Sequence, residues 1–85
     1  MPELSRFYGI IISIYRDDHP PPHFHARYGE YEASFVIETG AVLRGQVPPR
    51  IRGLIVEWVN LHQRELMDNW HRAVERQDLI SIDPL

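Results

Sequence analysis

The sequence predicts an α+β fold, an antiparallel meander of about four strands with one long C-terminal helix packed on one face. Residues 7–47 contain short apolar runs with period-two alternation, separated by turn residues. After Pro48-Pro49 the apolar residues recur at helical spacing. A glycine at position 29 marks a tight hairpin between two alternating runs. At 85 residues the chain is expected to form a single domain over residues 1–85.

Residues 7–16 are predicted to form one strand, which is apolar on both faces and therefore central or covered. Residues 23–28 and about 31–38 form a hairpin if Gly29-Glu30 is its two-residue loop. That register places Phe24 opposite Phe35 and predicts a cross-strand ion pair between Arg27 and Glu32. One face would then carry Phe24, Ala26, Tyr28, Tyr31, Ala33 and Phe35, and the other His23, His25, Arg27, Glu32 and Ser34.

A fourth strand is expected at about residues 42–47, after a three-residue loop that would place Ile37 opposite Leu43. The helix is expected from residue 50 to about residue 77, with a candidate break near Asp68-Asn69. Residues 79–85 alternate like a strand, so the tail is a candidate for a short C-terminal edge strand.

The helix carries two apolar stripes, more than one sheet needs to cover it. The first consists of Ile51, Leu54, Ile55, Trp58 and Leu66. The second, rotated stripe consists of Val56, Val59, Met67, Trp70 and Val74. The tail, a second copy of the chain or a different protein could cover this second stripe, so it is the predicted interaction surface.

Composition limits the location and the partners of the chain. There is no cysteine, which excludes disulfides and thiolate metal sites and is compatible with a reducing cytosol. No apolar run approaches about 18 residues, and the N-terminal segment lacks signal-peptide features, so we expect a cytoplasmic protein without a membrane span. The net charge of −3 does not favour nucleic acid as a partner.

Three histidines lie in the stretch between residues 17 and 32. His23 and His25 share a strand face, and with His19 they form a candidate metal site, for which Glu30 or Glu32 could add a carboxylate. Surface residues without a chemical role, and an acid–base or RNA-contacting role, are the alternatives.

Arginines form the second candidate site. Arg44, Arg50 and Arg52 lie around the last strand and the helix start and could hold a phosphate, although ordinary solvated charge is the favoured explanation. Arg44 faces away from the predicted core, so it can share a patch with the strand histidines. His62 falls in the first helix stripe, where a core histidine with one satisfied nitrogen is expected. His71 falls on the polar side of the helix.

The segment FYGIIISIYRDDHPPPHFHARYGEYEA resembles the opening of the family called domain of unknown function 4160. The most specific part is H-F-H-A at His23–Ala26, and the C-terminal half adds Asn60, Leu66, Trp70 and the closing I-D-P-L. The resemblance implies a small bacterial protein without an established activity, and it brings no catalytic residues. Such proteins are often encoded beside another small domain, which has prompted toxin–antitoxin suggestions.

Three functions follow as hypotheses. The first is a protein-interaction module that self-associates or binds a small protein partner through the second helix stripe, as in a toxin–antitoxin-like pair. The second is a metal-independent ribonuclease in which His23 or His25 acts as acid or base, while Arg27 and Arg44 steady phosphate charge. The third is a metal site on His19, His23 and His25. The first two need no cofactor, and none is expected.

Overall fold

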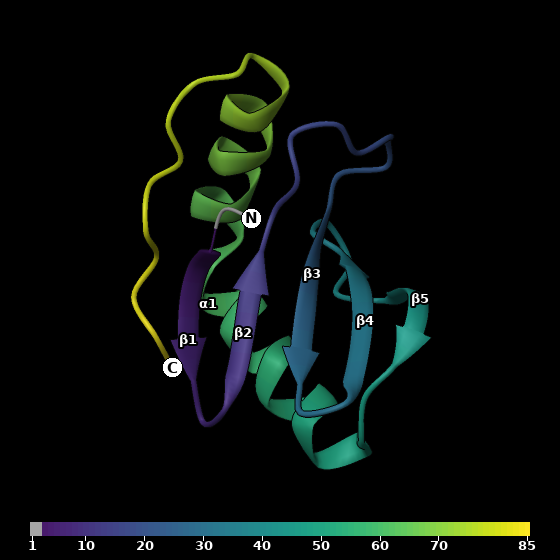
Figure 1. Cartoon of the computed structure of the whole chain (residues 1–85). Helices are drawn as coiled ribbons and strands as arrows, with labels where there is room; N and C mark the ends of the chain where they lie inside the picture. The colour runs from purple at the N-terminus through teal and green to yellow at the C-terminus, as the bar shows by residue number, and fades with distance from the viewer. Residues whose placement is uncertain (1–2) are drawn as a thin grey trace.

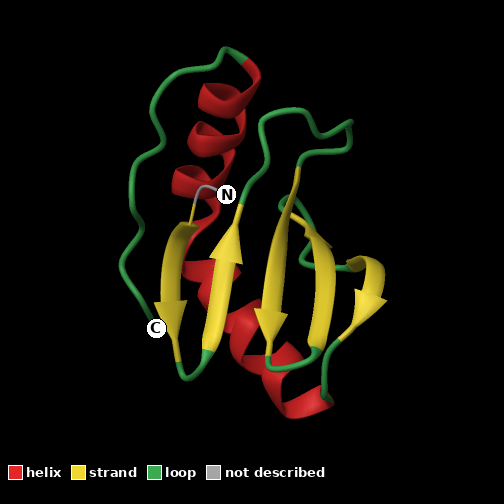
Figure 2. Ribbon diagram, viewed as in Figure 1, coloured by secondary structure: helices red, strands yellow, loops and turns green. Residues whose placement is uncertain are grey.

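Five antiparallel strands form one sheet in chain order, and a long helix crosses one face of it (Figures 1 and 2). The structure is a computed structural model that describes residues 3–85, so the first two residues of the segment considered for a signal peptide lie outside it. The elements are β1 (Glu3–Phe7), β2 (Ile10–Ser13), β3 (His23–Tyr28), β4 (Tyr31–Val36), β5 (Val42–Gln46) and α1 (Pro49–Val74). The α+β meander is confirmed, with five strands instead of about four.

The additional strand comes from the N-terminal segment. Residues 7–16 are not one strand, because the chain turns at Tyr8-Gly9 and joins β1 to β2 as a hairpin. Tyr8 and Gly9 both have positive φ, 49° and 80°, as the tightest hairpin turns require. Apolar residues on both sides of this turn hid it, although the glycine itself was a turn signal.

The predicted hairpin of β3 and β4 is confirmed pair by pair, from Tyr28 opposite Tyr31 to Phe24 opposite Phe35. Gly29 has the positive φ that the turn needs. Arg27 and Glu32 do lie opposite one another, but no ion pair joins them in the described part of the chain.

The pairing of β4 with β5 contains a bulge. Ser34 pairs with Arg44 and Phe35 pairs with Val42, which leaves Leu43 without a partner, so the predicted pairing of Ile37 with Leu43 is wrong. One residue beyond Arg44, Gly45 has a φ of 78°, and a Cβ there would clash with the carbonyl oxygen of Glu32. The strand therefore bends at this edge of the sheet, and all five of its residues are exposed.

The core lies between the sheet and α1. Trp58 is fully buried at its centre, with its ring centroid 5.3 Å from that of Phe7 and 6.0 Å from that of Phe24. The helix has no break at Asp68, but it is kinked at His62, whose φ is −128°. A kink changes which residues face the sheet, and the second stripe, derived for a straight helix, is divided by it. Its members take three positions: buried Val59 and Trp70, half-buried Val56 and Met67, and exposed Val74.

The tail runs beside β1 and α1, as the yellow trace in Figure 1 shows. It forms no strand, but the N–H of Ile82 donates to the carbonyl oxygen of Leu4 at 2.9 Å. Trp58 Nε1 donates to the carbonyl oxygen of Asp83 at 2.9 Å. Asn69 is almost fully buried and bonds both backbone groups of Ile80, at 2.7 and 2.9 Å. The tail therefore covers part of α1, which is one of the possibilities considered from the sequence.

Replacing Asn69 with alanine is expected to release the tail. Removing a buried side-chain amide that satisfies two backbone groups costs about 1–3 kcal/mol in the free energy of unfolding. Amide hydrogen exchange should show faster exchange at Ile80 and Ile82, with the centre of the sheet unchanged. Asn60→Ala, on an exposed position of the same helix, is the control. Unchanged protection of residues 79–83 in Asn69→Ala would mean that the amide does not hold the tail.

Within residues 3–85, no helix is long and apolar enough to cross a membrane.

Candidate functional site

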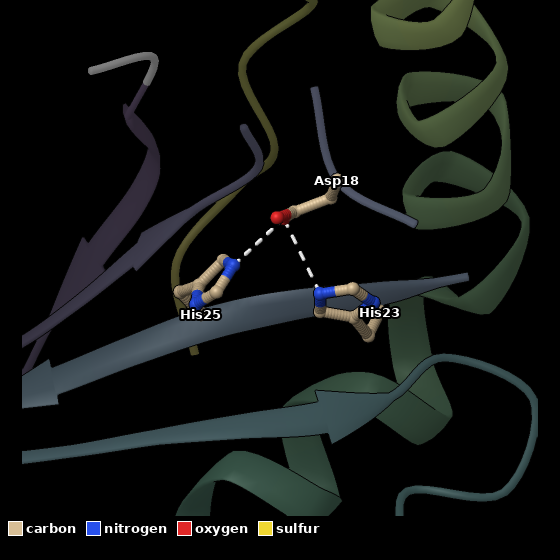
Figure 3. A group of neighbouring side chains, drawn as sticks. All are labelled: Asp18, His23 and His25. Carbon is tan, nitrogen blue, oxygen red and sulfur yellow. Dashed lines mark hydrogen bonds and ion pairs between the residues drawn. The ribbon is translucent and has the colours of Figure 1, made fainter. Parts of the chain in front are cut away.

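The histidine-rich end of β3 lies beneath the loop that joins it to β2. His23 and His25 are alternate residues of the strand, so their side chains share one face of it. The loop, which contains a cis Pro20-Pro21 bond, brings Asp18 back over that face. Figure 3 shows the Asp18 carboxylate between the two imidazole rings.

These three side chains, the Asp-His-His cluster, converge on a single carboxylate oxygen. Asp18 Oδ2 lies 2.7 Å from His25 Nε2 and 3.2 Å from His23 Nε2. One ligand atom from each residue lies within 4.8 Å of the others. The side chains of His23, His25 and Asp18 are 9%, 17% and 22% exposed, so the cluster is shielded but reachable from solvent.

The far side of each imidazole ring is also held. His23 Nδ1 lies 2.7 Å from the carbonyl oxygen of Pro21. A carbonyl oxygen can only accept, so His23 Nδ1 carries a hydrogen and donates it to Pro21, while Nε2 faces Asp18. His25 Nδ1 lies 3.2 Å from the hydroxyl of Ser34, its cross-strand partner. All four ring nitrogens therefore have a partner.

Aromatic rings fix the cluster from two sides. The ring centroid of Tyr15 lies 4.2 Å from that of His25, and the centroid of Trp70 lies 5.4 Å from that of His23. Burial raises the pKa of the Tyr15 phenol, and the nearby carboxylate of Glu32 raises it further. Tyr15 thus stays neutral beside the cluster well above physiological pH.

The cluster opens into a cleft of about 540 Å³. A row of cross-strand partners runs across its floor from His25 through Ser34 to Arg44. Twelve residues line this cleft: Asp18, His19, Pro20, Pro21, His23, His25, Glu32, Ala33, Ser34, Leu43, Arg44 and Gly45. Its volume is typical of a site for a small molecule.

The structure brings together part of each site predicted from the sequence. His23, His25 and Arg44 line the same cleft, whereas Arg27 lies outside it. His19 lines the cleft, but it is exposed and contributes no atom to the cluster. Asp18 occupies the third position of the cluster, which the metal hypothesis had assigned to His19.

The remaining candidates lie elsewhere. Arg50 and Arg52 are exposed at the start of α1, apart from the cleft. His62 has one satisfied nitrogen, because its Nδ1 lies 2.6 Å from a carboxylate oxygen of Glu65, but it is half-buried and not a core residue as expected. His71 is exposed, which agrees with its predicted place on the polar side of the helix.

Asp18 was missed by sequence reasoning. The carboxylates considered for a metal were Glu30 and Glu32, which are near the histidines across the hairpin. Glu30 lies in the hairpin turn and does not line the cleft. The available signal was an Asp-Asp pair just before the proline run, since a loop that returns to its own sheet brings its polar residues over the next strand.

The fold and the site define a small α+β domain. In it, the loop between β2 and β3 completes an Asp-His-His cluster on the sheet. The chain belongs to the family described as Domain of unknown function (DUF4160), whose model matches residues 9–71. The matched segment runs from β2 into the last turns of α1 and includes every residue of the cluster and of the cleft. Neither a curated protein nor a solved structure matches the chain.

Proposed function

We propose that Asp18, His23 and His25 bind one divalent transition-metal ion and that this ion supports hydrolytic chemistry in the cleft. The observation that carries the proposal is the convergence of three ligand atoms within 4.8 Å, with both imidazole rings held from behind. Two histidines and one carboxylate are a common ligand set of catalytic sites that keep a coordination position open.

The contacts behind the histidines support a metal. A histidine that ligates a metal usually donates its other N–H to a carbonyl, a carboxylate or water, which fixes the ring. The contact of His23 with the Pro21 carbonyl has this form, and Ser34 can play the same role for His25. His23 Nε2 and a carboxylate oxygen of Asp18 face each other at 3.2 Å, so a bound cation could take the lone pair of the neutral ring while the carboxylate balances its charge.

The metal-independent ribonuclease hypothesis has less support. A general acid or base needs a nitrogen that can reach the substrate. Both Nε2 atoms of the pair are turned toward the same oxygen of Asp18, and both Nδ1 atoms are turned toward Pro21 and Ser34. Arg27, assigned to phosphate binding in that hypothesis, does not line the cleft.

The chemistry follows from the ligands and the cleft. A zinc ion with three protein ligands can hold a water whose pKa is lowered to about 7. Glu32 lines the same cleft and its side chain forms no hydrogen bond or ion pair within residues 3–85, so its carboxylate is available to accept a proton. Nitrogen and oxygen ligands without sulfur suit Zn²⁺, Fe²⁺, Ni²⁺ and Mn²⁺. The proposal replaces the expectation that no cofactor is needed.

Calorimetric titration of the metal-free chain with Zn²⁺, checked by native mass spectrometry, tests the proposal. We expect about one ion per chain, proton release on binding and weaker binding as the pH is lowered, because protons compete for the histidine nitrogens. Binding that is absent, or that persists when both His23 and His25 are replaced by alanine, would overturn it.

The interaction-module hypothesis remains a prediction, but the surface available to a partner is smaller than the sequence suggested. Val59 and Trp70 are buried in the core and cannot contact a partner. Val74 is the exposed member of the predicted stripe, and Leu61 and Ile80 are further large exposed apolar residues of α1 and the tail. Association with a second copy or with a small protein would have to use such positions.

A further inference from the structure

Arg44 is the one arginine among the residues that line the cleft, within the described chain. Among residues 3–85 its guanidinium forms no hydrogen bond and no ion pair, although Glu32 lines the same cleft. Since adjacent strands lie about 4.8 Å apart, the backbone of Arg44 is roughly 10 Å from that of His25 along the cross-strand row. A small molecule can span that interval.

The bulge in β5 lies at the end of the cleft that contains Arg44. Leu43 and Arg44 are consecutive residues that both line the cleft, as are Glu32, Ala33 and Ser34 of the neighbouring strand. Leu43 is the bulged residue without a partner, and bulges are known to redirect side chains next to binding sites. The positive φ of Gly45 lies next to this bulge, and Leu43, Arg44 and Gly45 all line the cleft.

The loop between β2 and β3 contributes two apolar residues to the cleft, Pro20 and Pro21, beside Asp18 and His19. A ligand that fits these surroundings has an apolar body between the prolines and Leu43. Its anionic group would meet Arg44, whose planar fork matches a carboxylate or a phosphate. The net charge of −3 and the lack of a second arginine in the cleft argue against a nucleic-acid strand, which needs several phosphate contacts.

We propose that the cleft binds a small organic anion, a carboxylate or phosphate ester with an apolar body, whose charged group is held by Arg44. The reacting bond would lie at the opposite end, beside the Asp-His-His cluster. The inference rests on the proposed metal centre for that reacting end, whereas the grip on the anion depends on Arg44 and the cleft walls alone.

Phenyl phosphate and benzoate are suitable probes, with phenol as the uncharged comparison. Calorimetry and amide chemical shifts should detect binding of at least one anion, with shifts at Ser34 and Arg44, and no binding of phenol at the same concentration. Arg44→Gln is expected to weaken binding by about 10-fold or more, since it removes a charge-assisted hydrogen bond. Arg50→Gln, at the start of α1 and outside the cleft, should leave the affinity unchanged. The two anions separate phosphate recognition from carboxylate recognition.

Two results would overturn the inference. One is the absence of binding of both anions to the wild-type chain, with and without Zn²⁺. The other is equal affinity in wild type and Arg44→Gln. Zinc affinity is measured on the same samples and should be unchanged in Arg44→Gln. Failure of the wild type to bind zinc would therefore remove the proposed metal centre, while Arg44-dependent binding of the anions would still stand.

Discussion

His25→Ala and Asp18→Ala are each expected to weaken Zn²⁺ binding by about 100-fold or more. Changing a residue that only supports a metal ligand typically costs 10–100-fold, so losing a ligand should reach at least the upper end of that range. Neither change should unfold the chain, because His25 on β3 and Asp18 in the loop before it are both outside the hydrophobic core. Calorimetric titration gives the affinities, and circular dichroism checks the fold.

His19→Ala is the matched control, because His19 lies in the same loop and lines the same cleft without belonging to the cluster. Its zinc affinity should equal that of the wild type. If His19→Ala loses zinc as completely as His25→Ala does, the ion binds the histidines in the arrangement expected from the sequence alone, and the Asp-His-His cluster is not the metal site.

Trp58→Ala is expected to cost about 3–5 kcal/mol in the free energy of unfolding, the usual range for removing a large buried aromatic ring. Trp58 is fully buried between Phe7 and Phe24, and its indole N–H also holds the tail at Asp83. A small domain is stable by only about 5–15 kcal/mol, so most of the stability could be lost. Equilibrium unfolding in urea measures the change.

Leu61→Ala is the control on the same helix, since its side chain is 65% exposed and its removal should change stability by less than about 0.5 kcal/mol. Trp58→Phe keeps most of the ring but loses the bond to Asp83, and it remains measurable if the alanine variant does not fold. A Trp58→Ala variant as stable as Leu61→Ala would contradict the placement of Trp58 at the centre of the core.

The middle of the sheet was predictable because two constraints agree there. Gly29 specifies the turn, and the alternation around it places Phe24 and Phe35 on one face and His25 on the other. Only one register satisfies both, and the structure has that register. The change from strand to helix after Pro48 was equally clear, since the apolar period changes at that point.

Features that depend on contacts distant in sequence were not predictable. The bulge at Leu43 and the kink at His62 change which side chains face the core, and a regular strand or a straight helix contains neither. The site was half predictable for the same reason. His23 and His25 share a face by strand geometry, whereas Asp18 joins them only because the proline-containing loop folds back over β3.

Anomalous X-ray diffraction at the zinc edge, from crystals of the zinc-loaded chain, tests the central claim most directly. The account predicts one strong peak at about 2.0–2.2 Å from His23 Nε2, His25 Nε2 and a carboxylate oxygen of Asp18. A peak at exposed His71, or no peak in the cleft of a chain that is otherwise folded as described, would contradict it.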